Sequence, residues 1–209
     1  MSVAPTSSGR TSSGTASDRL SPFTSQAVFR VLLESLARPG SVHQLPAAGS
    51  GSQTEWPGPG IVPLALAVIG ARVAVVEAPS RRWKARICRA TGASEAAIGD
   101  ASLVAIYGSA DPGMISRLRR GSAAAPEDGT KVGVACTALT EGGPGDVTLE
   151  ISGPGVPGRA RLGVDGVDRE VFAALRAANS RFPAGVDVWF VDERGQVAGL
   201  PRSARQVVV

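Results

Sequence analysis

Few side chains in this sequence could act as a base or a strong nucleophile near neutral pH. The candidates are one histidine, His43, two lysines, Lys84 and Lys131, and two cysteines, Cys88 and Cys136. A metal site built from several histidines is therefore excluded, and a Ser-His-Asp triad would have to use His43. The cysteines form no CxxC pair, so we expect no metal centre. His43 is interpreted as a structural residue, and each lysine as a surface charge or, alternatively, a Schiff-base amine.

The arginines and the glycine-rich turns offer a different chemistry, which is the binding of anions. Asp187 begins an apolar segment, where a carboxylate needs a partner, and Arg202 follows the next apolar segment. We expect a structural ion pair between them if these segments are antiparallel strands, with anion binding by Arg202 as the alternative. The turn at Ser152–Val156 contains Gly153 and Gly155. Their N–H groups could contact an anion, although a purely structural turn is favoured.

Two more candidates lie in predicted loops. Arg38 stands immediately before Pro39–Gly40, which should end the first helix. Glu127 belongs to an acidic pair before Gly129 and could shape a turn or contact a partner. Because guanidinium groups bind highly anionic ligands through paired hydrogen bonds, Arg38 and Arg202 are the first choices for a ligand contact.

The composition limits the class of protein. The chain has 209 residues, a formal charge of +4 and 43% hydrophobic residues, which suits a globular protein with its own core. The basic balance would suit nucleic-acid binding, but the arginines are scattered and aromatic residues make up only 4%. The longest apolar run, residues 61–71, is too short to span a bilayer. The two isolated cysteines favour the cytoplasm, and we expect neither a nucleic acid nor a membrane as partner.

The pattern along the chain predicts helices that alternate with buried strands, followed by hairpins. Residues 1–20, rich in Ser, Thr and Gly, are expected to form a disordered tail, and residues 21–209 a single α/β domain. A first helix, capped by Thr24, should bury a face that includes Val28 and Leu32. Further helices are expected at residues 62–70 and 81–89. Asp111 should cap another helix that runs to Arg120, and Asp168 should cap a helix whose inward residues are Val171, Phe172, Leu175 and Ala178. Strands are expected at residues 41–45, 71–77, 103–108, 131–139, 146–152, 186–191 and 196–200.

Two strand pairings follow from the turns between these segments. Residues 131–139 should pair with residues 146–152, and residues 186–191 with residues 196–200. Phe182, just before the second hairpin, is expected to pack into the core. The order of elements predicts a single layered domain with a mixed β-sheet flanked by helices.

Five short blocks say more through their order than any of them says alone. They read Phe29-Arg30-x-Leu32-Leu33-x-x-Leu36-Ala37-Arg38-Pro39-Gly40, Gly121-Ser122-Ala123-x-x-Pro126-Glu127-x-Gly129, Ser152-Gly153-Pro154-Gly155-Val156, Phe182-Pro183-x-Gly185-Val186-Asp187 and Leu200-Pro201-Arg202. In this order and spacing, over roughly residues 21–205, they resemble the PhnH family, the H subunits of bacterial carbon–phosphorus lyase.

The resemblance implies a fold similar to a reduced pyridoxal-phosphate-dependent transferase without the cofactor lysine. It also implies a homodimer that joins the G, I and J subunits in a core complex. That complex is linked to the transfer of ribose 5-triphosphate from ATP to an alkylphosphonate during phosphonate breakdown. The resemblance implies no catalytic residue set for the H subunit. We expect a structural or assembly subunit that binds no cofactor alone, ATP being used by the complex.

One of the departures from the family pattern bears on a possible site. Residues 86–91 read Arg-Ile-Cys-Arg-Ala-Thr where a segment resembling Arg-Phe-His-Thr is expected, so any site that needs this aromatic residue and histidine is in doubt. Two other function classes stay open. One is a stand-alone pyridoxal-phosphate-type transferase that uses Lys84 or Lys131, and the other is a basic binding module for nucleic acid.

Overall fold

The computed structural model describes residues 19–46, 58–78 and 81–209, so nearly all of the expected tail, residues 1–20, lies outside the described residues. The helices are α1 Pro22–Ala37, α2 Ile61–Leu66, α3 Arg81–Thr91, α4 Pro112–Ser116 and α5 Arg169–Ala178, with 3-10 turns η1 Gly58–Gly60 and η2 Pro126–Asp128. The strands are β1 His43–Gln44, β2 Arg72–Val76, β3 Ser94–Glu95, β4 Leu103–Ile106, β5 Lys131–Ala135, β6 Ala138–Glu141, β7 Val147–Ser152, β8 Ala160–Asp165, β9 Asp187–Val191, β10 Gln196–Leu200 and β11 Arg205–Val208.

Seven of these strands form a mixed sheet in the order β1-β10-β9-β5-β4-β2-β3. The strands from β9 to β3 are parallel, whereas β10 and β1 extend the sheet through antiparallel pairs. The central strands β4 and β9 are buried over nearly their whole length and β5 at its three middle residues, as is usual when helices cover both faces of a parallel sheet. The predicted α/β class with a mixed sheet is confirmed.

The remaining four strands form a separate antiparallel sheet in the order β11-β7-β8-β6. The predicted hairpin between residues 131–139 and 146–152 is therefore wrong. The first segment divides after Ala135, so that β5 stays in the large sheet and β6 joins the small one. Strand β8, which the sequence pattern does not predict, lies between β6 and β7 and pairs with both. A nearby turn favours a hairpin, but pairing with a strand further along the chain prevails here.

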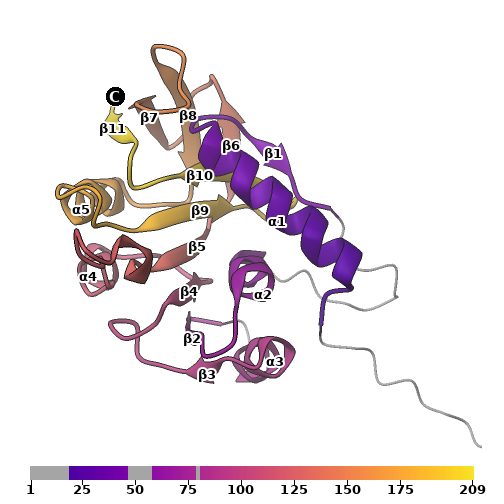
Figure 1. The fold of residues 1–209 in the computed structure, drawn as a ribbon. Helices are drawn as coiled ribbons and strands as arrows, with labels where there is room; N and C mark the ends of the chain where they lie inside the picture. The colour runs from indigo at the N-terminus through magenta and orange to yellow at the C-terminus, as the bar shows by residue number, and fades with distance from the viewer. Residues whose placement is uncertain (1–18, 47–57, 79–80) are drawn as a thin grey trace, which may run out of the picture.

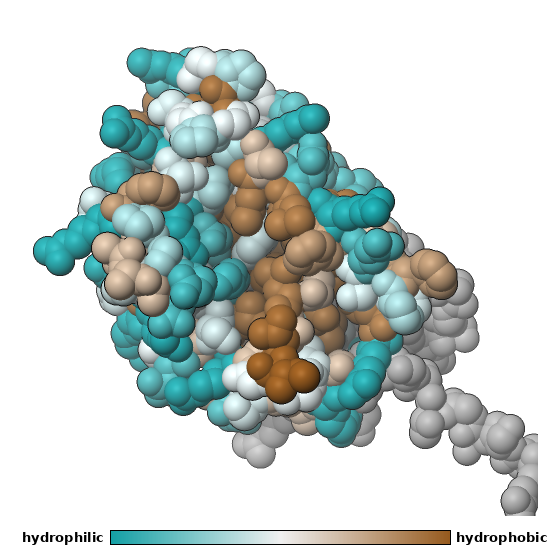
Figure 2. All heavy atoms as spheres, in the orientation of Figure 1, coloured by the Kyte–Doolittle hydropathy of each residue, from teal (hydrophilic) through white to brown (hydrophobic). Residues whose placement is uncertain are grey.

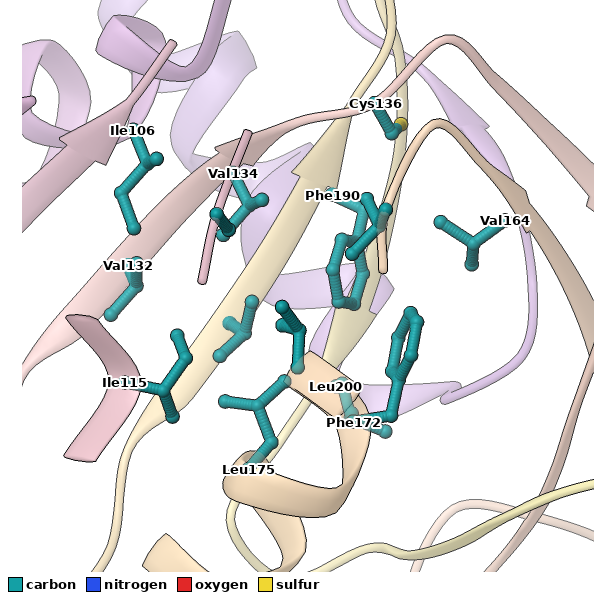
Figure 3. Close-up of a cluster of buried hydrophobic side chains, with 14 of the residues drawn as sticks. Ile106, Ile115, Val132, Val134, Cys136, Val164, Phe172, Leu175, Phe190 and Leu200 are labelled. Carbon is teal, nitrogen blue, oxygen red and sulfur yellow. The ribbon is translucent and has the colours of Figure 1, made fainter. Parts of the chain in front are cut away.

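Helices cover both faces of the large sheet (Figure 1). Helices α1 and α2 pack on one face, while α4, α5 and the small sheet pack on the other. Each face of the sheet has its own core, the first under α1 and α2 and the second under α4, α5 and the small sheet. Side chains alternate along β9, so Trp189 and Val191 belong to the first core and Val188 and Phe190 to the second. Figure 3 shows the second core, in which the rings of Phe172 and Phe190 have centroids 5.4 Å apart. The large sheet thus separates two cores.

Helix α1 begins earlier than predicted. Ser21 is its cap, because the Ser21 side-chain oxygen accepts a hydrogen bond from the Thr24 N–H at 3.1 Å. Pro22 favours this start, since the first turn of a helix does not need the N–H that proline lacks. The predicted buried face is confirmed, and the Leu32 carbonyl on it accepts a hydrogen bond from the Trp189 indole N–H at 2.9 Å.

Helix α2 is shorter than the predicted segment of residues 62–70. It ends at Leu66, and the apolar residues Val68 and Ile69 that follow it are 72% and 105% exposed. The apolar run therefore does not continue as a buried helix, and its last part lies at the surface.

Two predicted helix caps and the last hairpin are confirmed. Asp111 caps α4 through a hydrogen bond from the Met114 N–H at 2.9 Å, although α4 ends at Ser116 rather than Arg120. Asp168 caps α5 in a similar way, and the predicted inward residues of α5 are buried. Strands β9 and β10 form the expected antiparallel pair. The end of α5 and this hairpin position the residues of the candidate site.

Candidate anion-binding site

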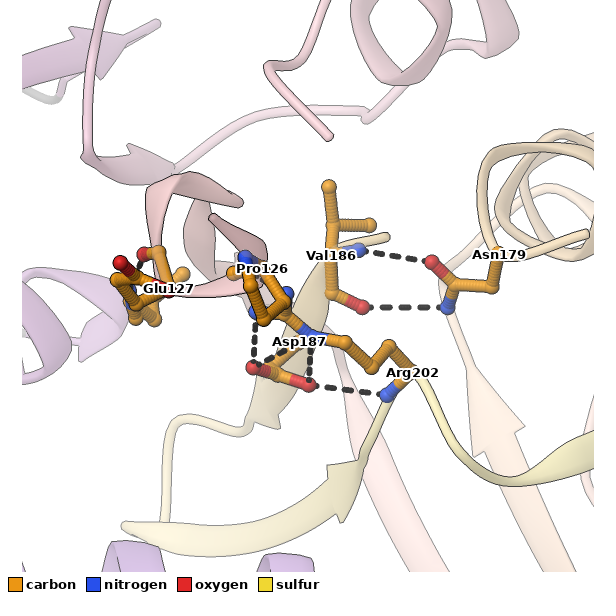
Figure 4. A network of polar contacts seen from close by, with 7 residues as sticks. Pro126, Glu127, Asn179, Val186, Asp187 and Arg202 are labelled. Carbon is orange, nitrogen blue, oxygen red and sulfur yellow. Dashed lines mark hydrogen bonds and ion pairs between the residues drawn. The ribbon is translucent and has the colours of Figure 1, made fainter. Parts of the chain in front are cut away.

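The centre of the site is an ion pair between Asp187, at the start of β9, and Arg202, just after β10 (Figure 4). Arg202 Nη2 lies 2.6 Å from Asp187 Oδ2, and Arg202 Nε lies 3.1 and 3.2 Å from the two carboxylate oxygens. The Arg202 backbone N–H also donates to Asp187 Oδ1 at 2.9 Å. The side chains are only 12% and 16% exposed, so the expected structural ion pair is confirmed.

Two loops close around this ion pair. Arg202 Nη1 donates a hydrogen bond to the Pro126 carbonyl in η2. A Cβ atom at Gly129 would overlap the Gly185 carbonyl and the Arg202 guanidinium, so this position requires glycine. The Gly185 N–H in turn donates to the Arg120 carbonyl at 2.7 Å. Three of the five sequence blocks, those around residues 121–129, 182–187 and 200–202, therefore meet at the ion pair.

Helix α5 is tied to the same place by Asn179, its C-terminal cap. The Asn179 Oδ1 atom accepts a hydrogen bond from the Val186 N–H at 2.8 Å, and Asn179 Nδ2 donates to the Val186 carbonyl at 3.1 Å (Figure 4). Because Val186 immediately precedes Asp187, this double contact fixes the end of the helix relative to the ion pair.

Lys131 lies beside Asp187 in the register of β5 and β9. Its Nζ donates to the Glu127 backbone carbonyl at 2.6 Å. Burial lowers the pKa of the Lys131 amine and the charge of Arg202 lowers it further, while Asp187 and two nearby carboxylates oppose these effects. The Glu127 side chain is exposed, so Glu127 contributes its carbonyl to the site rather than its carboxylate.

A hollow of about 820 Å³ opens beside the ion pair, between the end of α5, the strand β11 and the turn that follows β7. We name it the arginine hollow, and its lining includes Gly153, Arg176, Phe182, Arg202, Arg205 and Gln206. Of the six residues predicted as anion-binding or interface positions, Gly153 and Arg202 line this hollow. Neither Arg176 nor Arg205 is predicted by the sequence pattern, because both look like ordinary exposed arginines.

Arg38 and Gly155 lie elsewhere and have structural contacts. Arg38 is an exposed residue whose Nε lies 2.9 Å from Glu34 Oε1, one helical turn earlier. Gly155 has a φ of 79°, and a Cβ atom there would overlap the Ala37 carbonyl at the end of α1. The glycine turn thus packs against the Arg38-Pro39-Gly40 block, which favours the structural interpretation of this turn.

The histidine and the lysines are not brought together into one centre. His43 Nε2 lies 2.7 Å from Ser41 Oγ, a contact that the sequence pattern gives no reason to expect. The Ser41 hydroxyl also lies 2.6 Å from the Arg38 carbonyl, to which it donates, so Ser41 is held as a turn residue. Lys84 forms an ion pair with Glu95.

The cysteines are poorly suited to react. Burial raises the pKa of the Cys88 thiol, and burial together with Asp192 raises the pKa of Cys136. Both shifts disfavour the thiolate, which is the reactive form. Among the residues that the structure describes, no group of three His, Cys, Asp or Glu side chains could hold a metal ion. Within the same residues, every helix is too short or too polar to cross a bilayer.

A second hollow, of about 440 Å³, lies between α1, the end of α2 and the starts of β4, β5 and β9. We name it the apolar groove, and its lining includes Phe29, Leu33, Val68, Lys131, Asp187 and Trp189. Figure 2 shows a strip of apolar surface over the part of the molecule that α1 and α2 occupy. Phe29 and Leu33 are 41% and 49% exposed, so apolar side chains on this face are open to solvent.

Comparison with known families identifies the chain. The family model described as "Bacterial phosphonate metabolism protein (PhnH)" matches residues 19–207. No curated protein matches the sequence. The family match includes the ion pair, both hollows and all five sequence blocks. The chain therefore belongs to the PhnH family of bacterial phosphonate metabolism proteins.

Proposed function

We propose that this chain is the H subunit of a carbon–phosphorus lyase core complex and that it serves in assembly rather than as a catalyst by itself. It forms a homodimer in the cytoplasm and joins the G, I and J subunits. The complex transfers ribose 5-triphosphate from ATP to an alkylphosphonate. The family match over residues 19–207, nearly the whole chain, is the observation that carries this proposal.

The chemistry of the described residues supports an assembly role. Arg202 is engaged by Asp187 and by the Pro126 carbonyl, so its guanidinium serves the fold. The hydroxyl beside His43 already donates to a backbone carbonyl. Among the residues that the structure describes, neither hollow is lined by a histidine or a cysteine. Binding and positioning are therefore better supported than covalent catalysis by this subunit.

The apolar groove supports the presence of a partner. An exposed apolar strip of this kind commonly marks an interface. Among the described residues, the charged ones in its lining are Lys131 and Asp187, and Asp187 is already matched by Arg202. The unmatched charge is therefore positive, and the occupant should bring apolar side chains and a carboxylate. A second copy would present the same positive groove, so we assign this face to one of the other subunits.

Co-expression tests the proposal. We expect the tagged chain to co-purify with the G, I and J homologues from the same genome, and light scattering on the chain alone to give the mass of a dimer. The subunit proposal fails if this chain elutes alone while the other three assemble without it. A monomeric mass would remove the homodimer from the proposal.

Replacing Phe29 and Leu33 together with serine tests the face. Because both side chains are exposed, the double variant should fold normally while losing most of its co-purification with the partners. Val209→Ser is the matched control, since Val209 is 59% exposed and does not line the groove. Equal co-purification by the double variant and the control would exclude this face as the interface.

A further inference from the structure

We propose that the arginine hollow binds an organic phosphate or phosphonate of about nucleotide size, with its anionic group on Arg176 and Arg205 and its apolar part on Phe182. The choice of ligand rests on the proposed function, whose complex uses both ATP and an alkylphosphonate. The shared chemistry of the two is a tetrahedral oxyanion attached to an organic body.

The charge of the hollow is one-sided. In the part of the chain that the structure describes, its lining contains Arg176, Arg202 and Arg205 and no aspartate or glutamate. Arg202 is neutralised by Asp187, which leaves two positive charges for a ligand. A hollow lined by one sign of charge attracts ligands of the opposite sign.

The two available arginines come from different elements on the wall of the hollow. Arg176 lies in the last turn of α5, and Arg205 begins β11, opposite Ser152 of β7. Among the described residues, neither guanidinium makes a hydrogen bond or an ion pair. The carboxylate on the adjoining part of β7, Glu150, is already paired with Arg159. Both arginines can therefore turn toward an oxyanion and bind it through paired N–H groups.

The rest of the lining suits the organic body of such a ligand. Phe182, which the sequence pattern assigns to the core, is 66% exposed and lines the hollow together with Leu175, Leu200 and Val207. An exposed aromatic ring beside arginines is a platform on which a base can stack. The volume of about 820 Å³ is within the range of small-molecule sites.

A buried polar atom in the wall adds a separate indication. Gln206 is 4% exposed, lines the hollow, and donates through Nε2 to the Phe172 carbonyl at 2.6 Å. Its Oε1 atom has no hydrogen-bond partner among the described residues. Buried polar atoms are usually satisfied, so this oxygen is an acceptor available to a donor on the ligand after a small side-chain movement.

Calorimetric titration of the full chain at physiological salt tests the proposal with three probes, which are ATP, inorganic tripolyphosphate and methylphosphonate. We expect ATP to bind more tightly than tripolyphosphate, because only ATP carries a base for Phe182. The double variant Arg176→Gln with Arg205→Gln should weaken ATP binding at least about tenfold, the loss expected when charge-assisted contacts are removed. The control Arg194→Gln, in the turn between β9 and β10, should leave the Kd unchanged.

Each arm has an outcome that overturns part or all of the proposal. If neither ATP nor methylphosphonate binds, or if the double variant binds as tightly as the wild type, the site is refuted. If methylphosphonate binds and ATP does not, the ligand is the phosphonate and the nucleotide assignment is overturned. Phe182→Ala should weaken binding of ATP but not of tripolyphosphate, and an equal effect on both refutes the stacking.

The same variants separate this inference from the subunit proposal. If the double variant and the wild type both co-purify with the G, I and J subunits but neither binds ATP or methylphosphonate, the ligand site is wrong and the subunit role stands. If the isolated chain binds ATP through Arg176 and Arg205 yet never joins the partners, the subunit role fails and the site stands.

Discussion

The apolar groove and the arginine hollow lie next to the same ion pair, yet they differ in almost every property. Asp187 lines the apolar groove and Arg202 lines the arginine hollow, so each site contains one member of the pair. Because the two charges neutralise each other, neither sets the charge of the hollow that it lines. Lys131 sets the charge of the apolar groove, and Arg176 and Arg205 set the charge of the arginine hollow. A largely buried ion pair can thus lie between two hollows while other residues set the charge of each one.

The largest loss of stability is expected from removing one member of this ion pair. Asp187→Ala leaves the Arg202 guanidinium buried without its carboxylate, which should lower the free energy of unfolding by about 3–5 kcal/mol. Chemical denaturation measures this loss. Glu34→Ala is the control, because it removes the exposed ion pair with Arg38 and should cost less than about 1 kcal/mol. Equal losses in the two variants would show that the Asp187–Arg202 pair stabilises the fold no more than an exposed ion pair does.

A smaller effect is expected from the glycine turn in the wall of the arginine hollow. Gly155 and Gly158 have similar φ angles, 79° and 74°, so alanine causes similar backbone strain at both positions. At Gly155 the added Cβ would overlap the Ala37 carbonyl, whereas no atom of the described residues lies within 4 Å of a Cβ at Gly158. Overpacking at Gly155 should lower the free energy of unfolding of Gly155→Ala by about 1–3 kcal/mol more than that of Gly158→Ala. We therefore expect Gly155→Ala to have the lower melting temperature of the two variants. If the two variants have the same melting temperature, the turn does not pack against the end of α1.

The smallest effect concerns the charge of the apolar groove. Since burial lowers the pKa of Lys131 from its ordinary 10.5, the unfolded chain binds more protons than the folded one between the two pKa values. The contribution of Lys131 to the free energy of unfolding should therefore rise as the pH rises through this window, and Lys131→Met should lose this rise. Denaturation of both proteins at a series of pH values up to about 10.5 measures the difference. Parallel pH profiles would show that the amine is not desolvated.

Local patterns predicted the parts of the fold that depend on neighbouring residues. The caps Asp111 and Asp168 and the hairpin of β9 with β10 depend on side chains within a few positions of one another, and all are confirmed. The ion pair of Asp187 with Arg202 follows from that hairpin, because the antiparallel register alone brings the two residues together. The ion pair at the centre of the site could therefore be predicted from the sequence.

The errors arise where residues far apart in the sequence compete with local preference. The turn after β6 favours a hairpin with β7, but β8 pairs with both strands and separates them. Phe182 is apolar and was assigned to the core, yet the core on this side is filled by Phe172 and Phe190. The implied similarity to a pyridoxal-phosphate-dependent transferase fold stays a prediction.

The sequence by itself determined the α/β class, the family and the Asp187–Arg202 pair. Each of these depends on periodicity, on turn residues or on blocks in a fixed order. The tertiary structure alone decided where the unpaired charges lie. Arg176 and Arg205 belong to a helix and a strand with no sequence relation, and only the packing of α5 against β11 places them on one hollow. Charge acts through space, and distances in space between such residues are set by the whole fold.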